Sequence, residues 1–321
     1  MATFTIVIPF YQTKAGILRR SLQSVFEQTY RDFEVLVIDD ESPLPAEVEM
    51  EALDADQRSR ITVIRQANAG PGGARNTGLE NTSPLTRFVA FLDSDDTWLP
   101  HHLNNAFESM LCFGGDCYWA SIEASEEFHY HLAISELAEA DGVLRLGEQP
   151  LVIEIPDLAS AMLKDWSFLH LSGMVIGPTI FKKIRFDATL RRAAEDVLFF
   201  CDTILASRRS LLCGDPGVVR GLGVNIFHSI DRTSRHFLQQ QFNTWAALDA
   251  LEACFARRPE EVESIATSKG RARRQALWSQ AGLLRRGKVP NVGLLARWAW
   301  RDPELLLTLR ELGTAKFAEA K

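Results

Sequence analysis

Residues 88–96 read Phe-Val-Ala-Phe-Leu-Asp-Ser-Asp-Asp, five apolar residues followed at once by three carboxylates around one serine. A short apolar run bounded by polar residues predicts a buried strand, and α/β sheets bind ligands beyond the carboxyl ends of their strands. Three carboxylates this close repel one another, so a cation is expected to compensate them, and hard oxygen ligands suit Mg²⁺ or Mn²⁺ beside a phosphate. The alternative is an Asp-rich turn or helix N-cap, with Thr97 and Pro100 opening the next helix.

The residues before this run alternate between strand and helix patterns. Strands are predicted at residues 4–8, 33–38, 61–64 and 88–92, and helices at 17–28, 46–53 and 72–79. This order predicts a parallel sheet with right-handed crossovers. Three strand ends then meet at one edge of the sheet, at Pro9-Phe10-Tyr11, Asp39-Asp40 and Asp93-Ser94-Asp95-Asp96. Their convergence favours a binding site over three unrelated turns.

Beyond residue 110 the pattern is less regular. We expect a strand at 117–119, a strand or turn at 175–181, a helix at 197–206, a strand at 217–227 and helices from 235 onward. Glu195 and Asp196 begin the helix at 197–206, and the simplest interpretation is that they favour its dipole. His101 and His102 are expected on the exposed start of a helix.

Length and composition restrict the protein class. The 321 residues, 46% of them hydrophobic, allow one large α/β domain or one domain with a smaller appendage. No apolar stretch approaches the roughly 20 residues that cross a bilayer, and the N-terminus lacks a basic region, so it is expected to be a first strand. The five cysteines lack paired metal spacing and indicate reduced thiols in a cytoplasmic protein.

Taken together, these motifs resemble family 2 glycosyltransferases of the GT-A fold. The resemblance covers residues 4–205 in consistent order and includes six segments: 6–11, 24–30, 33–42, 68–79, the DxD-like 91–96, and 186–187 with 195–196. Two positions depart from the family pattern, because Gln12 stands where Asn is usual and Glu41 where Gly is usual. Both lie in turns, so we expect altered loops and unchanged chemistry.

The resemblance implies a mostly parallel, Rossmann-like α/β sheet with flanking helices and a C-terminal helical extension. It predicts a catalytic domain over residues 1–232, with a nucleotide-sugar half to about 110 and an acceptor half over 111–232. Residues 233–321 would form a basic helical extension. Processive members carry a Gln-x-x-Arg-Trp motif and membrane helices. Here Leu294 stands at the Gln position before Arg297-Trp298, which favours a single-addition enzyme.

The family also implies roles for individual residues. Asp39 would accept a hydrogen bond from the uracil imide, Asp93 would bind the ribose, and Asp95 would ligate Mn²⁺ or Mg²⁺. Asp96 would be either a neighbour of the ligands or a helix cap. Asp196 would be the base that takes the acceptor proton, with Glu195 orienting the acceptor. Further candidate metal ligands are Asp93 and His228, and Trp166 and His170 are candidates to line the acceptor site. The alternatives for these residues are ordinary packing or surface positions. Further predicted donor-site residues are Pro9, Phe10, Tyr11, Asp40, Asn68, Gly72, Arg75 and Ser94.

The predicted activity is therefore an inverting, metal-dependent, non-processive hexosyltransferase. The donor expected from the resemblance is UDP-glucose, used as a β-glucosyltransferase would use it, and the acceptor a lipid-linked exopolysaccharide intermediate. A nucleotidyltransferase would want a Gly-rich loop where Pro9-Phe10-Tyr11-Gln12 stands. A catalytically silent sugar-nucleotide binding or scaffold protein would be expected to lack Asp95 or Asp196.

Charge is distributed unevenly along the chain. The whole chain has a net charge of −7, but residues 256–321 contain 14 Lys/Arg against 7 Asp/Glu, a net +7 that leaves −14 on the rest. The cations alternate with Trp278, Leu283 and Leu284, and Trp298 and Trp300 follow. Basic helices with Trp suit a membrane interface, so peripheral contact with the cytoplasmic face of the inner membrane is expected, with a solvated helical face as the alternative. The acidic body argues against nucleic acid as a partner.

Overall fold

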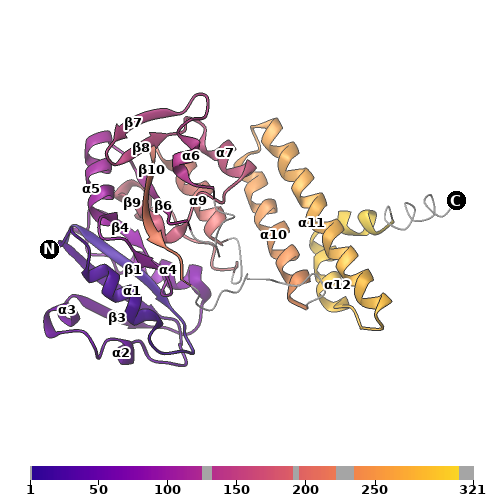
Figure 1. Cartoon of the computed structure of the whole chain (residues 1–321). Coiled ribbons are helices and arrows are strands. Elements are labelled where there is room, and N and C mark those ends of the chain that lie inside the picture. Colours follow the sequence, from indigo (N-terminus) through magenta and orange to yellow (C-terminus); the bar gives the residue numbers. More distant parts are fainter. Residues whose placement is uncertain (1, 125–131, 191–194, 222–234, 311–321) are drawn as a thin grey trace. The chain divides into compact units, whose positions relative to one another are not determined.

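The computed structural model describes residues 2–124, 132–190, 195–221 and 235–310. The chain forms two compact units, one made of residues 1–191 and 199–225 and the other of residues 192–198 and 226–321 (Figure 1). No helix among the described residues has both the length and the apolar character needed to cross a bilayer.

In the first third of the chain, strands and helices occur in the predicted order. The described residues contain the following elements. They are β1 (Phe4–Phe10), α1 (Ile17–Phe26), β2 (Phe33–Asp39), α2 (Ala46–Glu49), α3 (Ala55–Ser59), β3 (Ile61–Arg65), α4 (Gly70–Glu80), β4 (Phe88–Phe91), β5 (Thr97–Trp98), α5 (His102–Phe113), β6 (Cys117–Ile122), α6 (Ile134–Leu137), β7 (Leu144–Glu148), β8 (Leu151–Glu154), α7 (Leu158–Lys164), the 3₁₀ turn η2 (Leu171–Gly173), β9 (Met174–Ile176), α8 (Pro178–Phe181), α9 (Glu195–Ala206), β10 (Ser210–Val219), α10 (Arg235–Cys254), α11 (Pro259–Arg285) and α12 (Val292–Arg301).

One mixed sheet organises the first unit. Its order is β3-β2-β1-β4-β9-β6-β10-β8-β7, with β5 pairing separately with β10 (Figure 1). The strands β3, β2, β1 and β4 are parallel, as predicted, while β9 runs antiparallel between β4 and β6. Phe10 pairs with Asp39, and Asp39 with Arg65, so the ends of β1, β2 and β3 are level. The structure therefore has the level edge of parallel strand ends that the sequence predicted.

Three local predictions differ from the structure. The helix expected at 46–53 is helical only at 46–49, as α2, and a separate short helix, α3, follows at 55–59. The strand expected at 217–227 begins earlier, at Ser210, and contains Pro216 at a register shift against β6, where the missing proline N–H is tolerated. Residues 222–227 lie outside the described residues. His102, expected on an exposed helix start, is 1% exposed and packs against Trp98.

The two faces of the sheet are covered by different helices. Phe4, Ile6, Ile8 and Phe10 alternate along β1 and share one core cluster with buried residues of α1 and α5. Val7 points to the opposite face, towards α4. A Cβ on Gly78 of α4 would lie 2.3 Å from Val7 Cγ1, so glycine permits this close packing.

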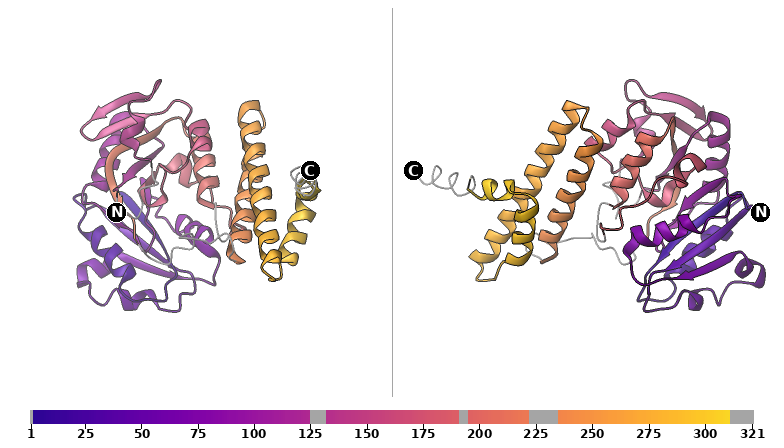
Figure 2. Two further views of the ribbon diagram at one scale, coloured as in Figure 1. Left: turned by 45° about the vertical axis from the view of Figure 1, so that its right-hand side comes forward. Right: turned by 180° about the vertical axis from the view of Figure 1, so that it is seen from behind.

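The described part of the second unit contains the helices α10, α11 and α12, shown in two further views in Figure 2. Its core includes Phe242, Trp245 and Trp298. The buried Arg273 guanidinium forms a two-pronged ion pair with Asp302, at 2.7 and 3.0 Å, and Asp302 also accepts the Trp298 indole N–H at 3.1 Å. Arg273 and Trp298 therefore belong to the interior of this unit, although the alternation of cations with Trp placed them on an exposed basic face.

Candidate active site

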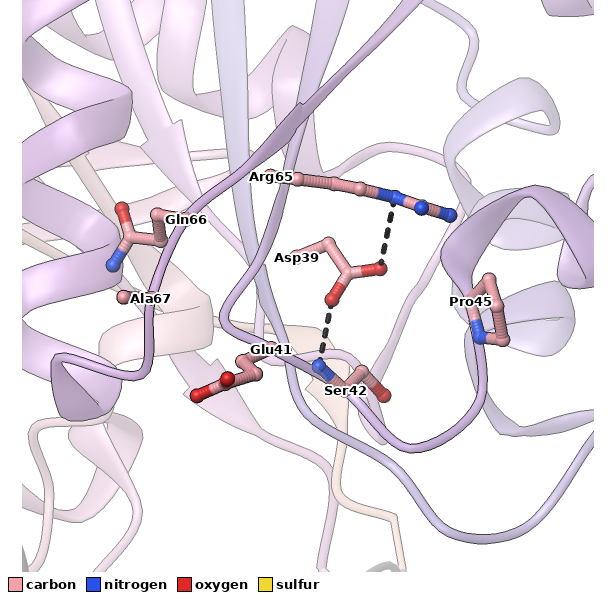
Figure 3. A pocket seen from close by; sticks show the side chains of 7 residues that line it. All are labelled: Asp39, Glu41, Ser42, Pro45, Arg65, Gln66 and Ala67. Atoms are coloured by element: carbon pink, nitrogen blue, oxygen red, sulfur yellow. Dashed lines mark hydrogen bonds and ion pairs between the residues drawn. The ribbon is translucent and has the colours of Figure 1, made fainter.

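A cavity of about 380 Å³ opens beside the end of β2. It is lined by Asp39, Glu41, Ser42, Pro45, Arg65, Gln66 and Ala67 (Figure 3). Asp39 Oδ1 accepts the Ser42 N–H at 2.8 Å, and Oδ2 accepts the Ala46 N–H at 3.2 Å. Because each carboxylate oxygen has two lone pairs, these bonds fix the Asp39 side chain and leave it able to accept from a ligand.

Arg65 brings a cation to the same cavity. Its Nε lies 3.9 Å from Asp39 Oδ2, and its Nη2 lies 2.5 Å from Glu47 Oε2. The Arg65 side chain is 59% exposed, whereas the Asp39 side chain is 4% exposed. The cavity thus combines a fixed, buried acceptor with a planar cation that is open to solvent, an arrangement suited to a flat polar ring.

Asp40 holds the start of α4 in place. Its carboxylate accepts the Ala69 and Gly70 N–H groups at 2.8 and 2.9 Å and the Gln66 side-chain amide at 2.7 Å. The Asn68 side chain donates to the Asp40 carbonyl oxygen at 3.1 Å. A carboxylate at this point satisfies free amide groups of the first helical turn and complements the helix dipole.

Residues 93–96, four residues with three carboxylates that we call the tetrad, follow β4 as a tight turn. The turn is closed by the Asp96 N–H, which donates to the Asp93 carbonyl oxygen at 3.0 Å. The Ser21 hydroxyl of α1 lies 2.8 Å from the Ser94 carbonyl oxygen and 2.6 Å from that of Asp96. The buried Gln12 side chain donates to the Ser94 hydroxyl at 3.2 Å. The turn is therefore fixed by residues from the beginning of the chain.

Arg75 of α4 supplies the positive charge that the sequence predicted for the tetrad. Its Nη2 donates to Asp93 Oδ1 at 2.6 Å, and its guanidinium lies 5.4 Å from the centre of the Phe186 ring. The Arg75 side chain is 5% exposed, so this ion pair is shielded from water and from salt. This contact pairs Arg75 directly with the acidic cluster.

Asp96 is held by segments far away in the sequence. Its Oδ2 accepts the Ser172 hydroxyl at 2.6 Å, and its Oδ1 accepts the Gly221 N–H at 2.8 Å. Ser172 also accepts the Asp93 N–H at 3.0 Å. His170 Nδ1 lies 3.7 Å from Asp96 Oδ2. A Cβ on Gly221 would lie 1.6 Å from the Asp95 carbonyl oxygen, so only glycine fits there.

The three carboxylates have unlike proton affinities. Burial, followed by the neighbouring Asp96 and Asp93, raises the pKa of Asp95 to about 7. Burial and then Asp93 raise the pKa of Asp96 to about 7. Burial also opposes ionisation of Asp93, but the Arg75 and His170 cations hold its pKa below the ordinary value. Such a cluster is poised to exchange protons for a cation.

Among the described residues, three side chains lie close enough together to hold a metal ion. One ligand atom each from Asp93, Asp96 and His170 lies within 4.8 Å of the others. Two carboxylates and an imidazole form a donor set that suits Mn²⁺. The sequence had proposed Asp93 with Asp95 and His228: Asp95 adjoins this group, and His228 lies outside the described residues. The sequence had placed Asp96 as a neighbour or cap and His170 at the acceptor site, with no pattern to join them.

The remaining predicted residues lie in several settings. Phe10 is 1% exposed and belongs to the core, whereas Tyr11 beyond it is 49% exposed. Gly72 is buried in α4. Glu195 and Asp196 are the first two residues of α9, where Asp196 Oδ1 accepts the Val197 N–H at 2.8 Å.

Comparison with known proteins gives a family and three informative similarities. Residues 5–165 match glycosyl transferase family 2. The chain is 58% identical over 318 residues to the succinoglycan biosynthesis protein ExoW of Rhizobium meliloti, which covers 99% of this chain and 100% of that protein. The motifs at residues 4–205 also suggest ExoW in particular, and this likeness is confirmed.

Two further similarities are more distant. The chain is 38% identical over 108 residues to the UDP-Glc:alpha-D-GlcNAc-diphosphoundecaprenol beta-1,3-glucosyltransferase WfgD of Escherichia coli, covering 33% of this chain and 40% of that protein. The solved structure of mannosyltransferase PcManGT from Pyrobaculum calidifontis, in complex with GDP-Man and Mn²⁺, matches with a TM-score of 0.54 and 16% identity, over 96% of this chain and 83% of that one. The predicted glycosyltransferase fold is thereby confirmed.

Proposed function

This chain belongs to glycosyl transferase family 2, and we propose that it transfers glucose from UDP-glucose, with inversion, to a lipid-linked glycan of exopolysaccharide assembly. The similarity to ExoW supports a role in exopolysaccharide synthesis. The similarity to WfgD supports a UDP-glucose donor, a lipid-diphosphate acceptor and a β-linkage. Without a processive motif, one sugar would be added in each cycle.

The observation that carries this proposal is the pairing of two acidic sites on one edge of the parallel strands. Asp39 lies at the end of β2 beside the cavity, and the tetrad at residues 93–96 follows the end of β4. Between β2 and β4 lies only β1, which pairs with both. This spacing suits a donor whose base and diphosphate occupy neighbouring places along one sheet edge.

The cavity beside Asp39 is the proposed site of the uracil ring. Uracil presents an imide N–H, which Asp39 accepts, whereas cytosine presents a bare nitrogen at the same place. The Asp39 carboxylate is already oriented by the Ser42 and Ala46 N–H groups, so little ordering is needed when the base binds.

The tetrad is the proposed site of the diphosphate. A divalent cation bound by Asp93, Asp95, Asp96 or His170 would neutralise the charge that develops on the leaving UDP. Arg75 fixes the orientation of Asp93, which leaves that carboxylate directed for the ribose or the cation. Ser172 and Gly221 do the same for Asp96.

Asp196 is the proposed base. Inversion needs one in-line displacement and one group to accept the proton of the acceptor hydroxyl. Asp196 is partly exposed at the first turn of α9, and its Oδ1 accepts the Val197 N–H, which fixes the carboxylate. Glu195 beside it is buried, which suits an orienting role.

A donor screen tests this proposal. The full chain is incubated with UDP-glucose, UDP-galactose, UDP-GlcNAc and GDP-mannose, together with a short-chain lipid-diphosphate acceptor, and released nucleoside diphosphate is measured with Mn²⁺, Mg²⁺ or EDTA. We expect release from UDP-glucose only with metal, and none from the Asp95→Ala variant. Full turnover in EDTA would remove the metal, and equal turnover of GDP-mannose would remove the uracil assignment.

A further inference from the structure

The last third of the chain contains a long segment without acidic residues. Residues 264–301 include nine Lys or Arg and no Asp or Glu. Lys269 and Arg273 are buried and paired with carboxylates from outside the segment. The other seven cations are exposed: Arg271, Arg274, Arg285, Arg286, Lys288, Arg297 and Arg301. The structure therefore separates two cations that stabilise the helical unit from seven that face solvent.

Three of the exposed cations share one line along α11 with a tryptophan. Because successive helical residues turn by about 100°, Arg271, Arg274, Trp278 and Arg285 fall within an arc of about 60°. We call these four residues the α11 stripe. Trp278 is 45% exposed, and the Arg285 guanidinium lies 6.0 Å from the centre of its ring.

The α11 stripe points away from the interior of its unit. Buried residues of α11, such as Ala272 and Ala276, lie on the other side of the helix, where they share one core cluster with residues of α10 and α12. The turn after α11 continues the exposed surface with Arg286, Lys288 and Val289, and Val289 is 86% exposed. Figure 2 shows this turn as the connection from α11 to α12.

We infer that the α11 stripe, with the turn that follows it, docks the protein on a bilayer that contains anionic lipids. Charge complementarity carries this assignment, because seven exposed cations face no acidic residue within the segment. The exposed Trp278 and Val289 beside the cations add the apolar contact that an interface offers and a soluble polyanion does not. Residues 1–255 have a net charge of −14, so long-range attraction to lipid would orient this surface towards it.

The inference deepens the proposed function in one respect only, since a lipid-linked acceptor would lie in the same membrane. The test is co-sedimentation of the full chain with phosphatidylcholine vesicles prepared with and without phosphatidylglycerol. We expect binding only to the anionic vesicles, weakened by added salt. Each basic residue near such a surface contributes about a fivefold change in partitioning, so the triple variant Arg271→Gln, Arg274→Gln, Arg285→Gln should bind about a hundredfold more weakly.

The matched control removes the same charge elsewhere. Arg58, Lys182 and Lys183 are exposed residues of the first unit, and their triple change to Gln should leave vesicle binding within a few-fold of wild type. Trp278→Ala should weaken binding about tenfold, because the ring supplies apolar burial. Thermal unfolding of each variant should match wild type, since all the changed side chains are exposed or half-exposed.

Two results would overturn the inference: equal binding to neutral and anionic vesicles, or equal loss in the two triple variants. Failure to bind either kind of vesicle would leave a protein partner as the occupant of the α11 stripe. The same α11 variant is assayed for UDP release with a short-chain acceptor free in solution, where it should equal wild type. Wild-type protein that transfers glucose but binds neither kind of vesicle would contradict this inference alone. Wild-type protein that binds anionic vesicles but transfers no sugar would contradict the proposed function alone.

Discussion

Ser172 is the residue on which the arrangement of the tetrad most depends, and its removal gives a sharp prediction. Its side chain is fully buried and makes two hydrogen bonds with the tetrad, donating to Asp96 Oδ2 at 2.6 Å and accepting the Asp93 N–H at 3.0 Å. Ser172→Ala removes both bonds without adding bulk. It leaves a main-chain N–H and a carboxyl oxygen with one partner fewer.

The cost follows from these two bonds. A buried donor left without its partner costs about 1–3 kcal/mol, and a bond to a carboxylate contributes about 1.5–3 kcal/mol. Partial relaxation reduces the sum, so we expect Ser172→Ala to lower the free energy of unfolding by about 3 kcal/mol. For a unit of this size, that corresponds to a fall in melting temperature of about 6–12 °C.

Ser109→Ala is the matched control. Ser109 is 2% exposed in α5, and its hydroxyl has no hydrogen-bond partner among the described residues. Alanine there removes an unsatisfied group and favours the helix, so stability should stay within about 0.5 kcal/mol of wild type or rise. Both variants are compared by thermal and urea unfolding in EDTA, which keeps metal binding out of the measurement. Equal melting temperatures for the two variants would refute the role given to Ser172.

Three further predictions concern pH, the base and the donor. Because the pKa values of Asp95 and Asp96 are raised to about 7, the folded state holds protons that the unfolded state releases near pH 4. In EDTA the melting temperature should therefore fall as pH rises from about 5 to about 8. The fall should be less steep in the Asp96→Asn variant. Asp196→Asn should lower the rate of transfer by roughly 10²–10⁴-fold and leave the affinity for UDP unchanged, and Glu195→Gln should lower the rate less. If Glu195→Gln lowers the rate more than Asp196→Asn, the roles of the two residues are exchanged. UDP should raise the melting temperature of the wild-type protein more than GDP or CDP does, and this difference should be lost in Asp39→Asn. Equal shifts for the three nucleotides in the wild-type protein would contradict recognition of the uracil ring by Asp39.

The parallel half of the sheet was predictable because its signals are local. Each of β1, β2, β3 and β4 is a short apolar run, and the helices between them show their own spacing. The handedness rule then places the strand ends at one edge without further information. The antiparallel β9 was predicted only in part: the strand or turn expected at 175–181 overlaps Met174–Ile176, but Pro178–Phe181 form the helix α8, and three residues are too few for a period to be recognised.

The contacts of the carboxylates were not predictable in the same way. Ser172 bonds to Asp93 across 79 positions and Gly221 to Asp96 across 125 positions, and neither residue belongs to a motif. Burial of Arg273 likewise depends on Asp302, 29 positions away. Single-sequence patterns report periodicity within one element, whereas these pairs depend on how elements pack.

The departure at Glu41 has a clear local explanation. The family pattern favours glycine there, and Glu41 has a φ of +60°, in the left-handed region that glycine occupies without strain. The loop therefore keeps the glycine conformation although the residue has changed. Glu41 also lines the Asp39 cavity, and its Oε2 accepts the Asn68 N–H at 3.3 Å. A side chain at this place adds a carboxylate to the cavity, so the substitution alters the lining more than the path of the chain.

The unlike settings of the three tetrad carboxylates suggest how a cation would be shared. Arg75 already balances Asp93, and Asp96 accepts from Ser172 and Gly221, so both start with partners that stabilise their charge. Burial and the neighbouring carboxylates nevertheless raise the pKa of both Asp95 and Asp96 to about 7. A divalent ion would therefore relieve repulsion at both residues, while Asp93 and Asp96 provide oxygen atoms that are already oriented. On this argument the motif carboxylate and the geometric group formed by Asp93, Asp96 and His170 are parts of one site, which explains why three acidic residues follow β4 where a turn alone would need one.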